Sequence, residues 1–193
     1  MKKLLVTIAM LATMVCSSFA LTISTGGSVN IGGIDSSEPE LNGATCGIGA
    51  FFNLDLILGF GFQSEINVTT SVVNIEDNKL VFSNASSTVD IPFMLWWNGK
   101  FGPIGVGAGA GINISANEIF YGDVYFGIAA GANLIYYFND HIGLLVGATG
   151  VFDFPGQLYY ENEYSEDKTY IGVKSEGWRR NNIYGKLGVM YRF

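Results

Sequence analysis

The chain has 193 residues, the length of a single domain, and 49% of them are hydrophobic, 14% aromatic and 14% charged. A soluble domain usually has about a quarter charged residues, so this composition argues against an ordinary soluble protein. The formal net charge is −7, and an acidic chain is a poor partner for nucleic acid. The 26 glycines are spread through the sequence and argue against long helices.

The first twenty residues have the pattern of a secretory signal peptide. Two lysines, Lys2 and Lys3, precede a short apolar stretch over residues 4–15, and small residues follow at the positions that a signal peptidase reads. We therefore expect cleavage after Ala20 and a mature domain of residues 21–193. A membrane-anchoring helix is the alternative, but the apolar stretch is short for a helix that spans a bilayer. Removal of the two lysines would change the formal net charge from −7 to −9.

The segments after residue 20 alternate large apolar residues with small or polar ones at a period of two, which is the period of a β-strand. A soluble sheet turns a polar face to water, whereas here the second face is rich in glycine with scattered polar groups. A membrane barrel needs a lipid-compatible outer face and a small or polar interior. One face carries, for example, Val89, Ile91, Phe93, Leu95 and Trp97, and the other carries Thr88, Asp90, Pro92, Met94 and Trp96.

Eight such segments predict an all-β fold, an eight-stranded antiparallel transmembrane β-barrel with an up-and-down meander. Closure removes the unpaired strand edges that hydrocarbon does not tolerate, and an even strand number brings both chain ends to one side. Short turns in such barrels are periplasmic and long loops are extracellular, so we expect both termini to be periplasmic. The expected strands are residues 21–34, 44–53, 56–69, 88–97, 104–114, 124–138, 142–154 and 181–193. The expected short turns are residues 53–55, 98–103 and 139–141, and the long links are 35–43, 70–87, 115–123 and 155–180.

Aromatic residues gather near the expected strand ends. Trp96, Trp97, Tyr137 and Phe138 fall toward the short turns, and Tyr159 falls toward a long link. Membrane barrels have a girdle of aromatic residues at each interface. We therefore expect two girdles, with ordinary core aromatics as the alternative.

Residues 90–97, 99–101, 105–109 and 136–144 and the closing Met190-Tyr191-Arg192-Phe193 carry a family resemblance. They are similar to small outer-membrane β-barrel proteins of the Gram-negative cell envelope, of the OmpA/OmpW-like and PorT-like type. The resemblance implies a porin-like barrel in the cell outer membrane, surrounded by outer-membrane lipid. It also implies that Tyr191 and Phe193 form the C-terminal signature that the barrel-assembly machinery reads. It implies no shared catalytic residues.

Four charged residues fall on the expected inward face of the barrel: Glu65, Asp90, Lys186 and Arg192. Opposite charges pair across a narrow interior so that none is buried alone, and eight strands leave a lumen just wide enough for side chains. We therefore favour paired structural charges over a gate or a polar path. The many inward glycines leave extra room, which keeps a path for small solutes as the alternative.

The sequence offers little catalytic or cofactor chemistry. Residues 105–110 fit a nucleotide-binding pattern in form, but their glycines recur at period two, whereas that motif opens a helix. The single histidine, His141, falls in an expected periplasmic turn, away from the outer rim where it would act as a general base. Cys46 is the one cysteine after residue 20, and we expect it to be buried or lipid-facing. We predict no enzyme, no cofactor, no metal and no nucleic-acid partner.

The last long link, residues 155–180, interleaves acidic and basic residues with tyrosines. Charged and aromatic loops on a rigid scaffold favour binding, and an ordinary solvated loop is equally compatible with this pattern. We predict a structural or surface-interaction role, with extracellular loops as a recognition surface for a host partner. The alternative is a passive port or binding site for small hydrophobic molecules. A third hypothesis is a soluble secreted barrel that binds lipid.

Overall fold

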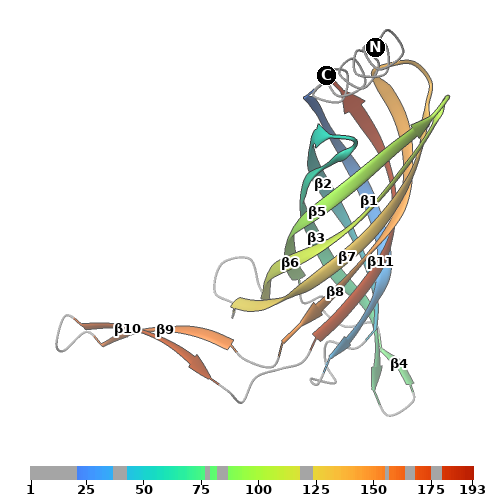
Figure 1. The fold of residues 1–193 in the computed structure, drawn as a ribbon. Helices are drawn as coiled ribbons and strands as arrows, with labels where there is room; N and C mark the ends of the chain where they lie inside the picture. Colours follow the sequence, from blue (N-terminus) through green and yellow to red (C-terminus); the bar gives the residue numbers. More distant parts are fainter. Residues whose placement is uncertain are drawn as a thin grey trace, which may run out of the picture.

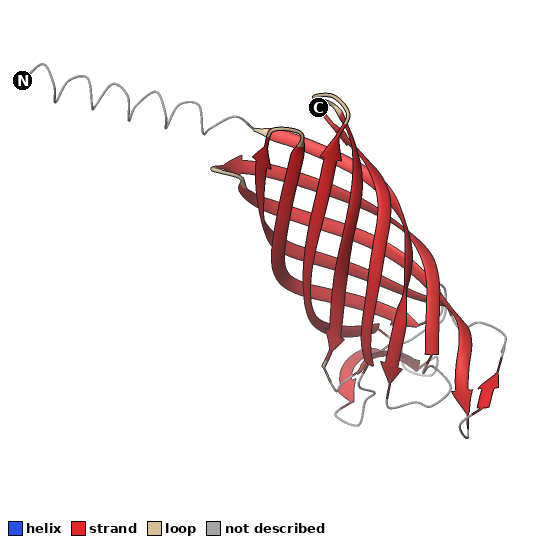
Figure 2. Cartoon of the chain, turned by 90° about the vertical axis from the view of Figure 1, so that its right-hand side faces the viewer, coloured by secondary structure: helices blue, strands red, loops and turns tan. Residues whose placement is uncertain are grey.

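The structure is a computed structural model, and it describes residues 21–36, 43–76, 79–81, 87–117, 124–154, 157–163, 168–174 and 180–193. The expected signal peptide, residues 1–20, lies outside the described residues. Within the described ranges, no helix is long and apolar enough to cross a membrane. The regular structure of these ranges is strand, and eight long strands close into a tilted barrel (Figures 1 and 2).

The barrel strands follow one another around the ring in chain order, each antiparallel to the next. The first strand closes on the last, with Ser24 opposite Arg192 and Ser36 opposite Arg180. The predicted eight-stranded meander is therefore confirmed, and the ring leaves no open edge. Its strands are β1 (Thr22–Ser36), β2 (Gly43–Ile57), β3 (Phe60–Glu76), β5 (Ser87–Phe101), β6 (Ile104–Asn117), β7 (Val124–Tyr137), β8 (Ile142–Asp153) and β11 (Arg180–Arg192).

Several strands extend further into the long links than the sequence pattern predicted. β3 runs to Glu76 rather than to residue 69, and β6 runs to Asn117 rather than to residue 114. The polar pair Thr70 and Ser71 resembles the start of a loop, but both residues pair with β2. Polarity does not end a barrel strand, because the inward face of the wall is itself polar.

The first short turn lies later in the chain than residues 53–55, where we predicted it. Asn53 and Asp55 belong to β2 and lie opposite Gln63 and Gly61. The turn is formed by residues 58–59, whose φ angles of 53° and 80° are both positive, as the twist of a tight hairpin requires. The prediction was wrong because Asn and Asp are common turn residues, whereas here they lie on the inward face of a strand.

Three short strands extend the barrel at the end that carries the long links (Figure 1). One pairs with the end of β3, with Lys79 opposite Glu76. The other two form an antiparallel hairpin that joins the barrel at one register position, Leu158 opposite Val124. The link predicted over residues 155–180 therefore contains regular structure. These strands are β4 (Lys79–Val81), β9 (Gln157–Glu163) and β10 (Lys168–Lys174).

The two faces of the wall follow the predicted alternation. Large apolar side chains face outward, and Ile31, Leu95 and Leu187 each expose more than half of their surface. Asn30 and Asn182 are among the polar side chains that face inward and are buried. A closed barrel with an apolar belt of this extent requires apolar surroundings, so the barrel spans a membrane.

Candidate functional site in the barrel lumen

A buried ion pair joins two walls of the lumen at its middle. The Nζ atom of Lys186 on β11 lies 2.7 Å from the Oε1 atom of Glu65 on β3, and both side chains are almost fully buried. Gln63 donates to Glu65 Oε1 at 2.5 Å, and Asn67 donates to Glu65 Oε2 at 3.0 Å. Asn67 also donates to the Tyr184 hydroxyl at 2.7 Å. The expected pairing of Glu65 with a lumen cation is thus present, and each Glu65 oxygen accepts a hydrogen bond.

A second charged cluster lies at the end of the lumen that carries the long links. Arg180 donates from Nη2 to Asp90 Oδ1 and from Nε to Asp153 Oδ2, the latter at 2.9 Å. Asn182 donates to Asp90 Oδ2 at 2.8 Å. Ser115 Oγ lies 3.0 Å from Asp90 Oδ1 and 2.9 Å from Asp153 Oδ1. All four carboxylate oxygens of this cluster therefore have hydrogen-bond partners.

Two members of the second cluster were missed from the sequence. Arg180 was assigned to the last long link, but it begins β11 and is buried. It shares the parity of Asn182, Tyr184 and Lys186, so extending the alternation two residues upstream would have found it. Asp153 ends β8 and is likewise buried. The sequence did not indicate that Asp90 and Asp153 lie close together. Both carboxylates form ion pairs with Arg180.

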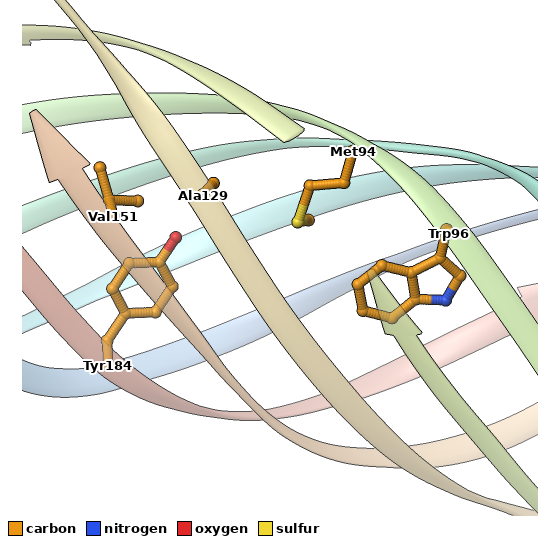
Figure 3. Packing of buried hydrophobic residues seen from close by; sticks show 5 residues of the cluster. All are labelled: Met94, Trp96, Ala129, Val151 and Tyr184. Carbon is orange, nitrogen blue, oxygen red and sulfur yellow. The ribbon is translucent and has the colours of Figure 1, made fainter. Parts of the chain in front are cut away.

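Trp96 fills the lumen between the charged clusters and the short-turn end. It is 1% exposed and packs with Met94, Ala129, Val151 and Tyr184 (Figure 3). The prediction that places Trp96 in an aromatic girdle is therefore wrong, because its parity turns it inward, whereas its neighbour on the chain faces out. In this inward position the indole fills the space beside the glycines of the neighbouring strands.

The inward glycines of β6 and β7 accommodate the Trp96 indole. A Cβ atom at Gly107 would lie 2.6 Å from the Trp96 Nε1 atom, and a Cβ at Gly131 would lie 3.4 Å from its ring. A Cβ at Gly109 would lie 2.5 Å from the same ring. The room that these glycines leave, which kept a solute path as an alternative, is therefore occupied by a side chain.

The short-turn end of the lumen holds an apolar cluster and an open cavity. Phe51, Ile135, Leu145 and Met190 pack together, with Tyr137 against them. Beyond them lies a cavity of about 260 Å³. Arg192, the fourth predicted lumen charge, lines this cavity and does not join Glu65 or Asp90.

The predicted C-terminal signature lies on the outer surface. Tyr191 and Phe193 are both exposed, and their rings meet edge to face with centroids 4.9 Å apart. The backbone N–H of Phe193 donates to the Ile23 carbonyl at 2.9 Å, which closes the barrel seam. His141 lies in the adjacent turn and stacks on Tyr191 at 5.8 Å, as expected for a residue of a short turn.

No group of three or more metal-ligating side chains occurs within the described ranges. Cys46 is exposed on β2, in a position that faces lipid, one of the two positions expected for it. The lumen of the described strands contains buried ion pairs and amide hydrogen bonds.

A family model described as Domain of unknown function (DUF2715) matches residues 10–193. No match to a curated protein sequence was found. Solved structures with a similar fold include Neisserial surface protein A (NspA), with a TM-score of 0.59 and 11% identity over 89% of this chain and 97% of that chain. The outer membrane protein OprG from Pseudomonas aeruginosa has a TM-score of 0.59 and 14% identity over 91% and 97%. Ail of Yersinia pestis, solved with the heparin analogue sucrose octasulfate, has a TM-score of 0.50 and 12% identity over 90% and 99%.

At these identities the likeness concerns the fold. The fold is that of small outer-membrane β-barrel proteins, which confirms the resemblance noted from the sequence. Together with the exposed apolar belt, this fold supports the predicted location in the outer membrane.

Proposed function

The chain belongs to the DUF2715 family, and we propose that it is a closed outer-membrane barrel that serves as a rigid scaffold for surface interaction. The observation that carries the proposal is the filled lumen. Arg180 reaches across the barrel to Asp90, Lys186 reaches Glu65, and Trp96 occupies the space beside the inward glycines. Side chains that join opposite strands across the lumen favour a scaffold role over an aqueous path for solutes. No catalytic role is proposed.

The recognition surface in this proposal is the end of the barrel that carries the long links. β3 and β4 continue beyond the ring there, and the β9–β10 hairpin extends from it (Figure 1). Loops on a rigid scaffold are the usual place for binding residues. Ail was solved with a sulfated polyanion, but this chain has a net charge of −7, so a host partner with a basic surface is the better electrostatic match.

We further propose that both termini face the periplasm and that residues 1–20 direct export. The two ends of the barrel chain lie on the side of the short turns (Figure 1), as in barrels with periplasmic termini. The outward Tyr191 and Phe193 suit a signature read by the barrel-assembly machinery. Phe193→Ala should slow assembly in cells while leaving refolding in detergent unchanged, and slow refolding in detergent as well would contradict this role.

The alternative function, binding of small hydrophobic molecules, is supported by one feature of the outer wall. A groove of about 450 Å³ lies on the lipid-facing side and is lined mainly by Leu56, Phe60, Phe62, Leu95 and Trp97. Such a groove offers an apolar molecule a site reached from the membrane rather than through the lumen. Uptake into liposomes of a lipophilic fluorescent probe, compared between the wild type and Phe62→Ala, tests this alternative.

Planar-bilayer recording and adhesion assays test the scaffold proposal. Refolded wild-type protein should give no resolvable single-channel currents, and steady open-channel currents would overturn the closed barrel. Cells that display a variant lacking residues 157–174 should adhere less to coated matrix proteins than cells that display the full chain. Equal adhesion at equal surface display would overturn the role of the hairpin. Immobilised heparin is the comparator, and we expect weak binding to it.

A further inference from the structure

The cavity at the short-turn end has a charge arrangement that the scaffold role does not use. Asp55 of β2 and Arg192 of β11 both line it. The two side chains line the same cavity but do not form an ion pair with each other. An acidic and a basic side chain that line one cavity without pairing offer two separate contacts to a ligand.

The guanidinium of Arg192 has unused donors. Among the described residues, its side-chain hydrogen-bond acceptor is the Thr22 hydroxyl, at the long distance of 3.3 Å. A guanidinium has five N–H donors in a fork that matches a carboxylate. Arg192 is therefore the group in this cavity that a small anion would satisfy.

The carboxylate of Asp55 is held in position by a chain of hydrogen bonds. Asn98 donates from Nδ2 to Asp55 Oδ1 at 2.6 Å, and the Trp96 indole N–H donates to Asn98 Oδ1 at 2.9 Å. The backbone N–H of Asn98 donates to the carbonyl of Gly59 in the adjacent turn at 2.8 Å. Asn98 uses one oxygen of Asp55, and no residue in the described part of the chain donates to the other, which is left to accept from a ligand.

The second cation of the cavity, Lys100, is engaged elsewhere. Its Nζ atom lies 3.6 Å from Asp140 Oδ1 and 4.7 Å from the centre of the Tyr137 ring. Lys100 therefore has an acidic partner and a ring contact of its own. This makes Lys100 a matched control for Arg192, because it is a cation that lines the same cavity from the opposite side of the ring and has partners of its own.

Asp55 and Arg192 lie on the two strands that flank β1, and the cavity that both line has room for a small molecule. β2 and β11 flank β1, with Asp55 opposite Thr22 and Arg192 opposite Ser24. Neighbouring strands lie about 4.8 Å apart, so the two backbones are separated by roughly 10 Å. The cavity, at about 260 Å³, is smaller than the roughly 300–1,000 Å³ of sites for drug-sized ligands. Apolar wall atoms come from Leu56, Val106 and Ile135.

We propose that this cavity binds a small carboxylate with a hydroxyl or amino donor on the adjacent carbon. Arg192 takes the carboxylate, and Asp55 accepts from the neighbouring donor. The proposal is independent of the scaffold role, because the cavity lies at the end of the barrel opposite to the long links. A simple carboxylate would satisfy Arg192 alone and would place no donor against Asp55, so it should bind more weakly.

NMR titration of the refolded protein in detergent micelles tests this site. L-lactate is the probe, propionate lacks the hydroxyl, and glycerol lacks the acid. The indole N–H signal of Trp96, assigned by elimination with Trp97→Phe and Trp178→Phe, reports on the site through Asn98. We expect a saturable shift with lactate, a weaker affinity for propionate and no saturable shift with glycerol. The absence of saturation with lactate would overturn the proposal.

Four variants assign the contacts. Arg192→Gln should weaken lactate and propionate alike, by about tenfold, and Arg192→Lys should be intermediate because it keeps the charge without the fork. Asp55→Asn should weaken lactate by about fivefold and leave propionate unchanged. Lys100→Gln should change either affinity by less than about twofold. The proposal would be overturned if Lys100→Gln and Arg192→Gln lost equal affinity for lactate. It would also be overturned if neither Arg192→Gln nor Asp55→Asn lost affinity. Heat-modifiable gel mobility verifies folding, and Arg192→Lys carries the test if Arg192→Gln does not fold.

Discussion

Arg180 and Asp90 meet across the full width of the barrel. Arg180 begins β11 and Asp90 lies in β5, the diametrically opposite strand of the eight-stranded ring, yet their buried side chains form an ion pair. The same guanidinium holds Asp153 on the neighbouring β8 at 2.9 Å. One side chain therefore joins opposite walls of the barrel, close to the end that carries the long links.

Replacing Arg180 by methionine should strongly destabilise the barrel. The substitution leaves Asp90 and Asp153 buried without a cation, and breaking a buried pair by removing one partner costs about 3–5 kcal/mol. Reversible urea unfolding of the protein in lipid vesicles measures the loss.

The control for this prediction removes the charges on both sides. Arg180→Met combined with Asp90→Asn and Asp153→Asn should regain part of the lost stability, because no uncompensated charge then stays buried. The alternative is that the triple variant loses as much free energy of unfolding as the sum of the losses from Arg180→Met, Asp90→Asn and Asp153→Asn measured separately. That result would show that the loss comes from packing rather than from charge.

The sequence predicted the wall of this barrel better than its contents. Period-two alternation follows directly from the strand geometry, so lipid-facing residues such as Leu95 and Leu187 could be assigned from the sequence. The closure of the ring decides which inward side chains contact one another. The alternation in the sequence does not indicate these contacts. The Lys186–Glu65 pair joins strands that are three places apart around the ring.

Trp96 and Arg180 show where simple rules mislead. An aromatic residue near a strand end usually belongs to a girdle, but parity places Trp96 inside the barrel. A charged residue beside a long polar link resembles part of the loop. Arg180 nevertheless begins a strand, because its buried guanidinium forms ion pairs with Asp90 and Asp153. In both cases the parity of neighbouring residues is the better guide than the residue type.

Replacing Trp96 by alanine should widen the lumen beside Gly107 and Gly131, so that the ion pairs of Arg180 and Lys186 are the remaining obstruction. The indole fills the space beside Gly107 and Gly131, and no other side chain would occupy that space after truncation without rearrangement. We expect small single-channel currents in planar bilayers from Trp96→Ala, where the wild type gives none. Trp97→Ala, on the outward face of the same strand, is the matched control and should remain silent. Currents in both variants would mean that general loosening of the wall, not the loss of the Trp96 side chain from the lumen, is responsible.

Adding a methyl group at Gly109 should disturb the contact between β6 and β5. A Cβ there would lie 2.5 Å from the Trp96 ring and 3.0 Å from the Trp96 Cα atom, so both the side chain and the backbone would have to shift. We expect Gly109→Ala to cost about 1–3 kcal/mol in urea unfolding, the range of overpacked cores. Gly27→Ala is the control, since the nearest atom, the Gly49 carbonyl oxygen, would lie 3.6 Å away. Its effect should stay within about 0.5 kcal/mol, and equal losses in the two variants would contradict this reasoning.

A charge on the outer wall distinguishes a membrane barrel from a soluble secreted one. Leu187 faces outward near the middle of β11, opposite Val29 and Val146 in the neighbouring strands. In a bilayer, an arginine at mid-depth costs about 2–4 kcal/mol and one near the interface about 0–1 kcal/mol. Leu187→Arg should therefore be much more destabilising in vesicles than Phe138→Arg, which lies in an exposed short turn. In a soluble barrel both substitutions would be exposed changes within about 0.5 kcal/mol. Two small and equal effects would thus refute the membrane location, and a clear dependence on depth would fix the position of the bilayer on the barrel.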